Sequence, residues 1–464
     1  FTCGDKRSNY ICISDDKGEN IIQKTLPCSV HGNEVGRATG DRLIYKNGRL
    51  YFGSQTAGII YSEDMGDSWQ SVDLFGEKNI SLIWTDSEGK LFIAGCSGEA
   101  NSPDGVTRGH TLYCSTDGLK SFVPLTAPDP VKYENSSYYG FVPQRITSDS
   151  RYIYITFASS GEVFYGGMGA YACDTGSLSG GKVYRYRIEN GVPVFNKDIT
   201  PEDHIPCGYS GICSNGKMLL LSTVCRKNGG DIIYTSTDSG ESWKIIMNRL
   251  EYCRFDWNIP YMKPRYNGGG NCVHWISDIK LSPFDSDTAL FNTGTGLFMI
   301  TGLASGDVLV KPFCEGIEET VHLNVYTTPH GRNRIIDIIG DLGGFAFEDY
   351  DSECENSFAN ENGDRYITCL NADLTLSDPE YIVSTPRGNW TGKTKGGLIL
   401  SKDCGSTWER LPMPRGLSEF IDKKLDNIEK PNVDSGWTAI SADGKRIMWA
   451  VAGGRGFSNK AVCY

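Results

Sequence analysis

An internal repeat constrains the fold of this chain more than any other sequence feature. The pattern S-x-D-x-G-x-x-W occurs in full at residues 62–69, 236–243 and 401–408. Two shorter copies without the tryptophan begin at Ser14 and Ser115. A unit that recurs along one chain is typical of architectures in which each repeat packs only on its neighbours.

The chemistry of the repeat is that of a tight hairpin turn. Ser and Asp side chains hydrogen-bond backbone groups of a turn, Gly tolerates a positive φ, and Trp returns to pack within the sheet. The residues concerned are Ser62, Asp64, Gly66, Trp69, Ser236, Asp238, Gly240, Trp243, Ser401, Asp403, Gly405 and Trp408. Because one structural turn explains every copy, we interpret these aspartates as structural and not catalytic.

Between the repeats, the sequence is that of an all-β chain. Short β-branched and aromatic runs, such as residues 151–157, 182–188 and 217–224, are bounded by Gly, Asn, Asp and Pro. The 55 glycines mark hairpin turns, since no Gly/Ser or Pro tract of linker length interrupts the runs. We therefore expect a β-propeller, either one large ring or parts of two.

The charge of the chain argues against nucleic acid as a partner. The net charge of −12 comes from 57 acidic and 45 basic residues, which are spread along the chain without long blocks of one sign. A net negative charge repels a phosphate backbone, and no basic segment offers a binding track. No run approaches the roughly 18 apolar residues of a membrane-spanning helix, so no membrane partner is expected either.

The cysteines and glycosylation sequons favour an oxidising compartment. Sixteen cysteines occur without a repeated C-x-x-C pair or a Cys/His cluster, so we expect disulfides and no metal or other cofactor. Sequons at Asn79, Asn135 and Asn389 are usable only in a secretory pathway. Together they predict a secreted, extracellular glycoprotein with mostly paired cysteines. A bridge between Cys3 and Cys463 would close a ring.

The repeat resembles the Asp-box of sialidases, sortilins and glycoside hydrolase family 74, which joins the outer strands of a propeller blade. Other segments resemble family 74 in particular. Residues 32–37 and 40–43 resemble its G-N-x-x-G-R and G-E-R-L runs. Residues 275–287 and 293–296 resemble its W-x-x-x-[IL]-x-I-D-P-F-x-x-D and G-T-G runs.

The most specific similarity lies farther along the chain. Residues 315–320 and 339–345 resemble the G-I-E-E-T and G-D-x-x-G-F motifs of family 74, in the same order. The motifs, which together span about residues 10–450, are specific in combination. Glu318 and Glu319 do not form an acid/base pair, because adjacent strand residues point to opposite faces.

The resemblance implies a fold and a reaction. Family 74 enzymes have two seven-bladed propellers facing each other across a cleft that holds a branched β-1,4-glucan. They invert the anomeric centre with one aspartate from each propeller. The aspartate of the G-D-x-x-G-F motif matches Asp341, whose implied role is general acid. Asp-Leu-Gly-Gly is also a turn sequence, so a structural role for Asp341 stays open.

Inverting hydrolysis needs a second carboxylate, roughly 6.5–9.5 Å from the acid. In the family it lies in a T-D-x-G-G-x-Y segment upstream of the G-N-x-x-G-R run, which this sequence does not contain. One interpretation is a fragment, with 1–330 as most of a first propeller and 331–464 as the start of a second. The other, which we favour, is a single ring of about seven to nine blades over 1–464, with absent or weak hydrolysis.

Sugar binding depends less on a carboxylate pair, because aromatic faces stack on pyranose rings. Aromatic residues near loop signals therefore form a predicted platform, although each also fits packing between blades. They are Tyr138, Tyr139, Phe141, Tyr165, Trp257 and Tyr261. The expected function is recognition of xyloglucan or another β-glucan, with inverting endo-β-1,4-glucanase activity if Asp341 is competent. The alternative is an inert structural subunit of an extracellular assembly or filament of copies of the chain.

Overall fold

A computed structural model describes most of the chain, and the statements below concern its described ranges. These are residues 9–28, 30, 40–54, 56–72, 80–97, 107–108, 110–125, 138–139, 142–159, 180–203, 205–226, 230–248, 251–262, 273–317, 320–354, 357–388, 394–412 and 436–451. Within them the regular structure is β-strand, and no helix is long and apolar enough to cross a membrane.

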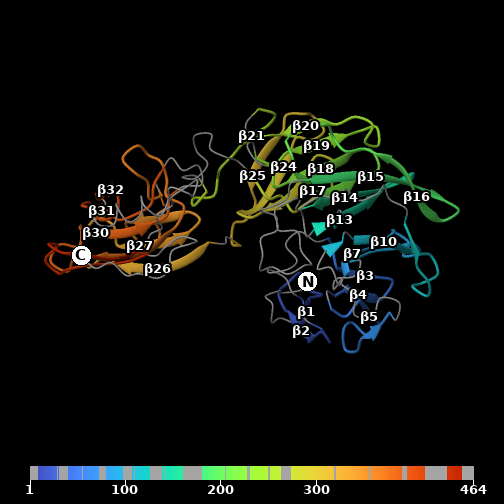
Figure 1. Cartoon of the computed structure of the whole chain (residues 1–464), viewed down its shortest axis with the longest axis horizontal. Coiled ribbons are helices and arrows are strands. Elements are labelled where there is room, and N and C mark those ends of the chain that lie inside the picture. The colour runs from blue at the N-terminus through green and yellow to red at the C-terminus, as the bar shows by residue number, and fades with distance from the viewer. Residues whose placement is uncertain are drawn as a thin grey trace. The chain divides into compact units, whose positions relative to one another are not determined.

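Contacts divide the chain into two compact units (Figure 1). Unit 1 comprises residues 1–256 and 271–313, and unit 2 comprises 257–270 and 314–464. The boundary lies close to residue 330, where the two-part interpretation divides the chain. Closure of all the blades into one ring stays a prediction.

Unit 1 begins with a hairpin and continues with antiparallel sheets whose strands pair in chain order. The hairpin is β1 (Tyr10–Ile13) and β2 (Ile22–Thr25). The first three sheets are β3 (Leu43–Lys46), β4 (Arg49–Gly53), β5 (Ile59–Ser62) and β6 (Gln70–Ser71); β7 (Ile80–Thr85), β8 (Phe92–Ser97), β10 (His110–Ser115) and β11 (Val123–Pro124); and β13 (Val142–Ser148), β14 (Tyr152–Ser159), β15 (Gly180–Glu189) and β16 (Val192–Asp198).

Two more sheets and a short parallel pair complete the described part of unit 1. The fourth sheet is β17 (Gly208–Ser214), β18 (Leu219–Val224), β19 (Ile233–Ser236) and β20 (Lys244–Met247). The fifth is β22 (Asp278–Leu281), β23 (Ala289–Thr293), β24 (Gly296–Thr301) and β25 (Leu309–Pro312), with β21 (Arg254–Phe255) parallel to β25. The separate pair is β9 (Thr107–Arg108) and β12 (Tyr138–Tyr139).

Unit 2 repeats the same organisation. Its sheets are β26 (Val321–Thr327), β27 (Ile335–Gly340) and β28 (Gly343–Phe347); β29 (Cys369–Leu374), β30 (Ile382–Pro386), β31 (Ile399–Ser401) and β32 (Glu409–Arg410); and β33 (Gly436–Ile440) with β34 (Ile447–Val451). The predicted all-β fold of four-stranded antiparallel sheets is confirmed.

All three complete S-x-D-x-G-x-x-W motifs form the turn between the third and fourth strands of a sheet. In each copy the Ser hydroxyl accepts a hydrogen bond from the Gly N–H at 2.7, 2.9 and 2.7 Å. The Asp carboxylate accepts the backbone N–H four residues later at 2.8, 2.9 and 2.8 Å. The short copies at Ser14 and Ser115 make equivalent bonds in the β1–β2 and β10–β11 turns.

These hydrogen bonds also lower the pKa of the motif aspartates and so keep them ionised. Bonds from Ser68 and Ser62 hold the pKa of Asp64 at about 2, and bonds from Ser242 and Ser236 do the same for Asp238. A carboxyl group with such a low pKa has no proton to donate near neutral pH. This supports the structural interpretation of the motif.

The motif tryptophans differ in burial. Trp408 is 4% exposed and packs on Phe358 with 4.5 Å between ring centroids. Trp69 and Trp243 are only half-buried, because each lies at the margin of a core cluster. The prediction of largely buried tryptophans is therefore confirmed for Trp408 and met in part by Trp69 and Trp243, which pack against core clusters and do not lie in solvent.

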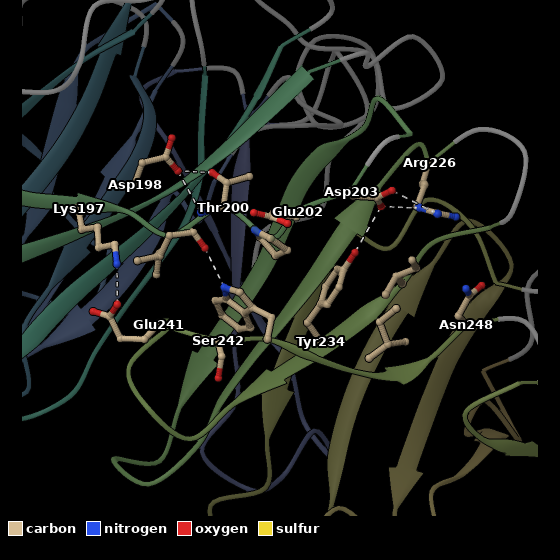
Figure 2. A pocket seen from close by; sticks show the side chains of 16 residues that line it. Lys197, Asp198, Thr200, Glu202, Asp203, Arg226, Tyr234, Glu241, Ser242 and Asn248 are labelled. Carbon is tan, nitrogen blue, oxygen red and sulfur yellow. Dashed lines mark hydrogen bonds and ion pairs between the residues drawn. The ribbon is translucent and has the colours of Figure 1, made fainter.

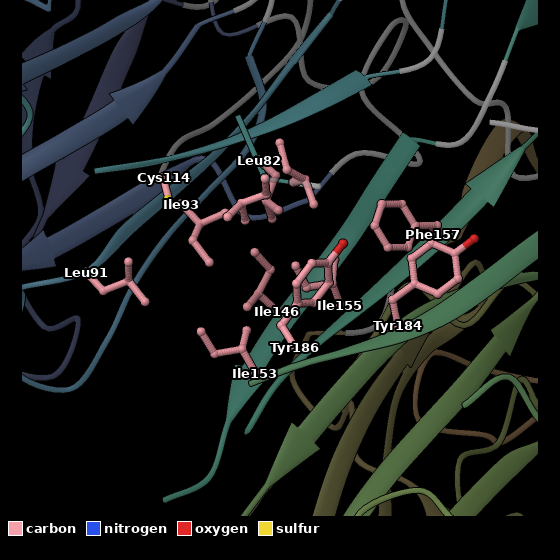
Figure 3. Packing of buried hydrophobic residues seen from close by; sticks show 12 residues of the cluster. Leu82, Leu91, Ile93, Cys114, Ile146, Ile153, Ile155, Phe157, Tyr184 and Tyr186 are labelled. Carbon is pink, nitrogen blue, oxygen red and sulfur yellow. The ribbon is translucent and has the colours of Figure 1, made fainter. Parts of the chain in front are cut away.

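The apolar core lies between neighbouring sheets. Figure 3 shows one cluster, in which Leu82 and Ile93 from the second sheet meet Ile153, Phe157 and Tyr186 from the third. Alternate strand residues supply these contacts, so each sheet is buried by its neighbour, as expected for radial repeats.

The cysteines correct one expectation. Seven of those in the described ranges carry free thiols, six of them buried: Cys28, Cys114, Cys207, Cys213, Cys314, Cys369 and Cys404. Burial raises the pKa of Cys207 and Cys369 to about 12, so they pack as small neutral residues. The expectation of nearly complete pairing is wrong for this set. Cys3 and Cys463 lie outside the described residues.

An ionic cluster joins three sheets of unit 1. Arg145 on β13 places its Nε 3.4 Å from Asp41, just before β3, and 3.2 Å from Asp278 on β22. Lys280 on β22 lies 3.0 Å from Asp278 and 3.6 Å from Asp41. The elements that begin the first, third and fifth sheets therefore converge here. We call these four residues the central ion cluster.

Candidate functional site

Asp341 occupies the turn between β27 and β28. Its side chain is exposed, and its φ of 62° lies in the left-handed region that few side chains adopt. The Asp341 N–H donates to the Thr368 hydroxyl at 2.9 Å, and the Gly343 N–H donates to the Ile367 carbonyl at 2.7 Å. The residues just before β29 of the next sheet thus fix the backbone of the turn.

Gly343 is required for this arrangement. Its φ is 87°, and a Cβ there would lie 2.8 Å from the Tyr366 carbonyl oxygen. Gly343, at a variable position of the G-D-x-x-G-F motif, therefore holds the Asp341 carboxylate at the exposed end of a rigid hairpin. An exposed acid on a constrained, left-handed backbone is typical of a functional site, although the turn alone also accommodates Asp.

Tyr261 lies beside this turn. It packs with Leu342 and Phe347 against the buried residues Ile339, Phe345 and Cys354. The structure therefore brings together two predicted site residues, Tyr261 and Asp341, in unit 2. The half-buried ring of Tyr261 supports the turn, and its role in sugar binding stays a prediction.

The structure gives less information about the roles of the other predicted site residues. Trp257 is half-buried in unit 2. Tyr138 and Tyr139 form β12, which pairs in parallel with β9. Several predictions lie outside the described residues: those on Phe141, Tyr165, Glu318, Glu319 and the sequons at Asn79, Asn135 and Asn389.

Sequence reasoning missed an aromatic surface in unit 1. Trp275 has a φ of 61° and is 37% exposed, and its ring contacts His274 with centroids 5.2 Å apart. A Cβ on Gly294 would lie only 3.1 Å from the indole, so the glycine leaves room for the ring. Trp275 and Gly294 both lie in segments that resemble family 74, residues 275–287 and 293–296. That resemblance was the sequence feature that could have identified this surface.

A buried carboxylate holds the backbone of Trp275 in place. Asp231 is 1% exposed and accepts the backbone N–H of Ile276 at 3.1 Å. It also accepts the Thr223 hydroxyl at 2.9 Å and the Arg226 N–H at 3.0 Å. Burial raises the pKa of Asp231 to about 6, although these donors oppose the shift.

This raised pKa predicts a pH effect on unit 1. Between about pH 4 and pH 6 the folded protein keeps the Asp231 proton that the unfolded chain has released, so stability falls as pH rises through this window. Lowering the pH from 7 to 4.5 should add about 2 kcal/mol of unfolding free energy from this group. Urea unfolding at several pH values measures it. In Asp231→Asn this component should be absent, and an unchanged pH profile would contradict the assignment.

A groove between the third and fourth sheets of unit 1 has a volume of about 460 Å³. Figure 2 shows that most of its charged side chains bond other residues of the groove. Asp203 accepts Arg226 Nε at 2.7 Å, Lys197 pairs with Glu241, and Trp243 Nε1 donates to the Ile199 carbonyl at 2.7 Å. These groups already have protein partners, so we assign the groove a structural role.

Metal ligation finds no support in the described ranges. They contain no group of three or more His, Cys, Asp or Glu side chains that could hold an ion.

Comparison with known proteins identifies homologues over nearly the whole chain. No family model matches. A Paenibacillus sp. protein named xyloglucanase is 24% identical over 99% of this chain and 44% of its own length. An Emericella nidulans protein named oligoxyloglucan-reducing end-specific xyloglucanase is 24% identical over 95% of this chain and 58% of its own. The chain thus spans about half the length of these relatives.

Solved structures agree on the fold. The GH74 xyloglucanase from Xanthomonas campestris matches with a TM-score of 0.72 and 21% identity, over 97% of this chain and 61% of that one. The Niastella koreensis GH74 enzyme matches with a TM-score of 0.70 and 21% identity, over 96% and 58%. The resemblance to family 74 in the sequence motifs is confirmed.

Proposed function

We propose that this chain recognises xyloglucan and that Asp341 is the general acid of any hydrolysis that it performs. The observation that carries the proposal is the exposed Asp341 on its anchored turn, in a chain whose homologues are named xyloglucanases. Recognition requires only surfaces that fit a glucan. Hydrolysis also requires a second carboxylate to activate water.

The Trp275 surface is the recognition element that we assign to unit 1. Its ring is partly exposed, rests over Gly294, and has a backbone fixed by Asp231. A pre-positioned aromatic ring binds a pyranose face with little loss of conformational entropy. This makes Trp275 the best described candidate for a stacking platform.

The corresponding test is a binding measurement. Trp275→Ala should weaken binding to xyloglucan oligosaccharides by about tenfold in calorimetry, as expected for loss of an aromatic stacking contact. Trp437→Ala provides a matched control, since Trp437 is an exposed tryptophan of unit 2. Equal losses in both variants, or none in Trp275→Ala, would argue against a platform at Trp275.

Association of copies is a second candidate function. The edge strand β26 exposes Val321, Leu323 and Val325, which are 53%, 43% and 53% accessible. A row of apolar side chains on an edge strand favours association. Sedimentation analysis distinguishes the cases, because a subunit of an assembly gains mass with concentration and a monomer does not.

The secreted, extracellular location remains part of the proposal. It rests on the three sequons, because the free thiols remove much of its support from the cysteines.

A further inference from the structure

A hydrogen-bonded chain of three side chains joins β26 to β27. His322 Nδ1 lies 2.9 Å from Asp337 Oδ1, and His322 Nε2 lies 2.6 Å from Thr320 Oγ1. Asp337 is only 7% exposed, whereas about half of the His322 side chain is accessible. The chain therefore runs from a buried carboxylate outward to a hydroxyl. We call it the Thr320 relay.

The strand register places the outer end of the relay beside Asp341. Val321 pairs with Gly340, so Thr320, which precedes Val321, lies level with Asp341, which follows Gly340. His322 pairs with Ile339. The same antiparallel pair thus carries the relay and leads into the turn of the candidate site.

We infer the direction of the Thr320 hydroxyl from the His322 tautomer that an Asp337 carboxylate favours. A carboxylate at Asp337 accepts the Nδ1–H of His322, which leaves Nε2 of the neutral ring as an acceptor. Nε2 then accepts the Thr320 O–H, and the oxygen of Thr320 keeps its lone pairs for another donor. A sugar hydroxyl is such a donor.

We propose that Thr320 binds a hydroxyl of the glycan at the Asp341 turn as a hydrogen-bond acceptor, with His322 and Asp337 as its positioning residues. This inference rests on the proposed glycan recognition. It adds a specific glycan contact, at Thr320 in unit 2. It also explains why the buried Asp337 carboxylate lies beneath the exposed His322 ring.

Two threonine variants test the contact itself. Thr320→Val should lower the affinity for xyloglucan oligosaccharides by about fivefold, the effect of one neutral hydrogen bond, whereas Thr320→Ser should keep it. Thr327→Val, at the other end of β26, is the matched control and should bind as wild type. If the wild type binds and Thr320→Val binds equally well, the inference is wrong while the proposed function stands.

A second measurement does not depend on any glycan. Nitrogen NMR of protein labelled in its six histidines should show His322 as the Nδ1–H tautomer, and Asp337→Asn should disturb that tautomer without unfolding the protein. An Nε2–H tautomer in the wild type would overturn the relay. Absence of xyloglucan binding by the wild type, with the Nδ1–H tautomer present, would refute the proposed function and the glycan contact together.

Discussion

Replacing Asp341 with asparagine is expected to lower reducing-end release from xyloglucan by about 10²- to 10⁴-fold, the usual contribution of a general acid. Binding of the polysaccharide should change little. Asn adopts a positive φ as readily as Asp, and the anchoring bond to Thr368 uses the backbone N–H of residue 341. The variant therefore removes the acid and keeps the turn. Reducing-end assays and a binding titration on the same preparations measure both effects.

Asp351→Asn is the control for this experiment. Asp351 is another exposed carboxylate in unit 2, beyond β28, and its replacement makes the same change in charge. Equal turnover by wild type and Asp341→Asn would assign Asp341 to the turn alone. Binding without turnover in the wild type would show recognition that lacks a working base. Neither binding nor turnover would favour the structural subunit.

The sequence predicted those parts of the fold that local chemistry determines. The motif turns were predictable because Ser62 and Asp64 bond backbone groups no more than four residues away. The family-like motif also located Asp341, and Gly343 beside it explains the turn. Local sequence did not reveal that Tyr261 packs beside Leu342, since that contact depends on tertiary structure.

Non-local contacts account for the main errors and omissions. Trp275 rests over Gly294, and Asp231 holds its loop, but neither relation follows from spacing in the sequence. The prediction of nearly complete cysteine pairing relied on their even number. Whether two cysteines form a disulfide depends on the distance between their Cβ atoms and on the direction of the side chains, which the sequence does not show. In the structure, Cys369 and Cys404 fill core positions between strands instead.

Loss of Arg145, one of the two cations in the central ion cluster, should be more destabilising than the other single changes proposed above. Arg145→Met is expected to remove about 3 kcal/mol of unfolding free energy, because it leaves the largely buried Asp278 with Lys280 as its one remaining cation in the central ion cluster. The Arg145 side chain is 12% exposed and lies between Asp41 and Asp278. Burial acts to raise the pKa of Asp41, but Arg145 and Lys280 outweigh it and hold that pKa below its usual value.

The measurement is urea unfolding followed by tryptophan fluorescence, with Arg254→Met as the matched control. Arg254 pairs with Asp307 at 3.1 Å in the same unit, but both side chains are well exposed, so its loss should change stability by less than about 1 kcal/mol. Similar effects of the two variants would mean that the central ion cluster is solvated and does not hold the sheets together. A large loss in Arg145→Met that Asp278→Asn partly restores would show that an unpaired buried charge causes it. The first strands of separate sheets would then depend on one another for stability, and unit 1 should unfold in a single transition.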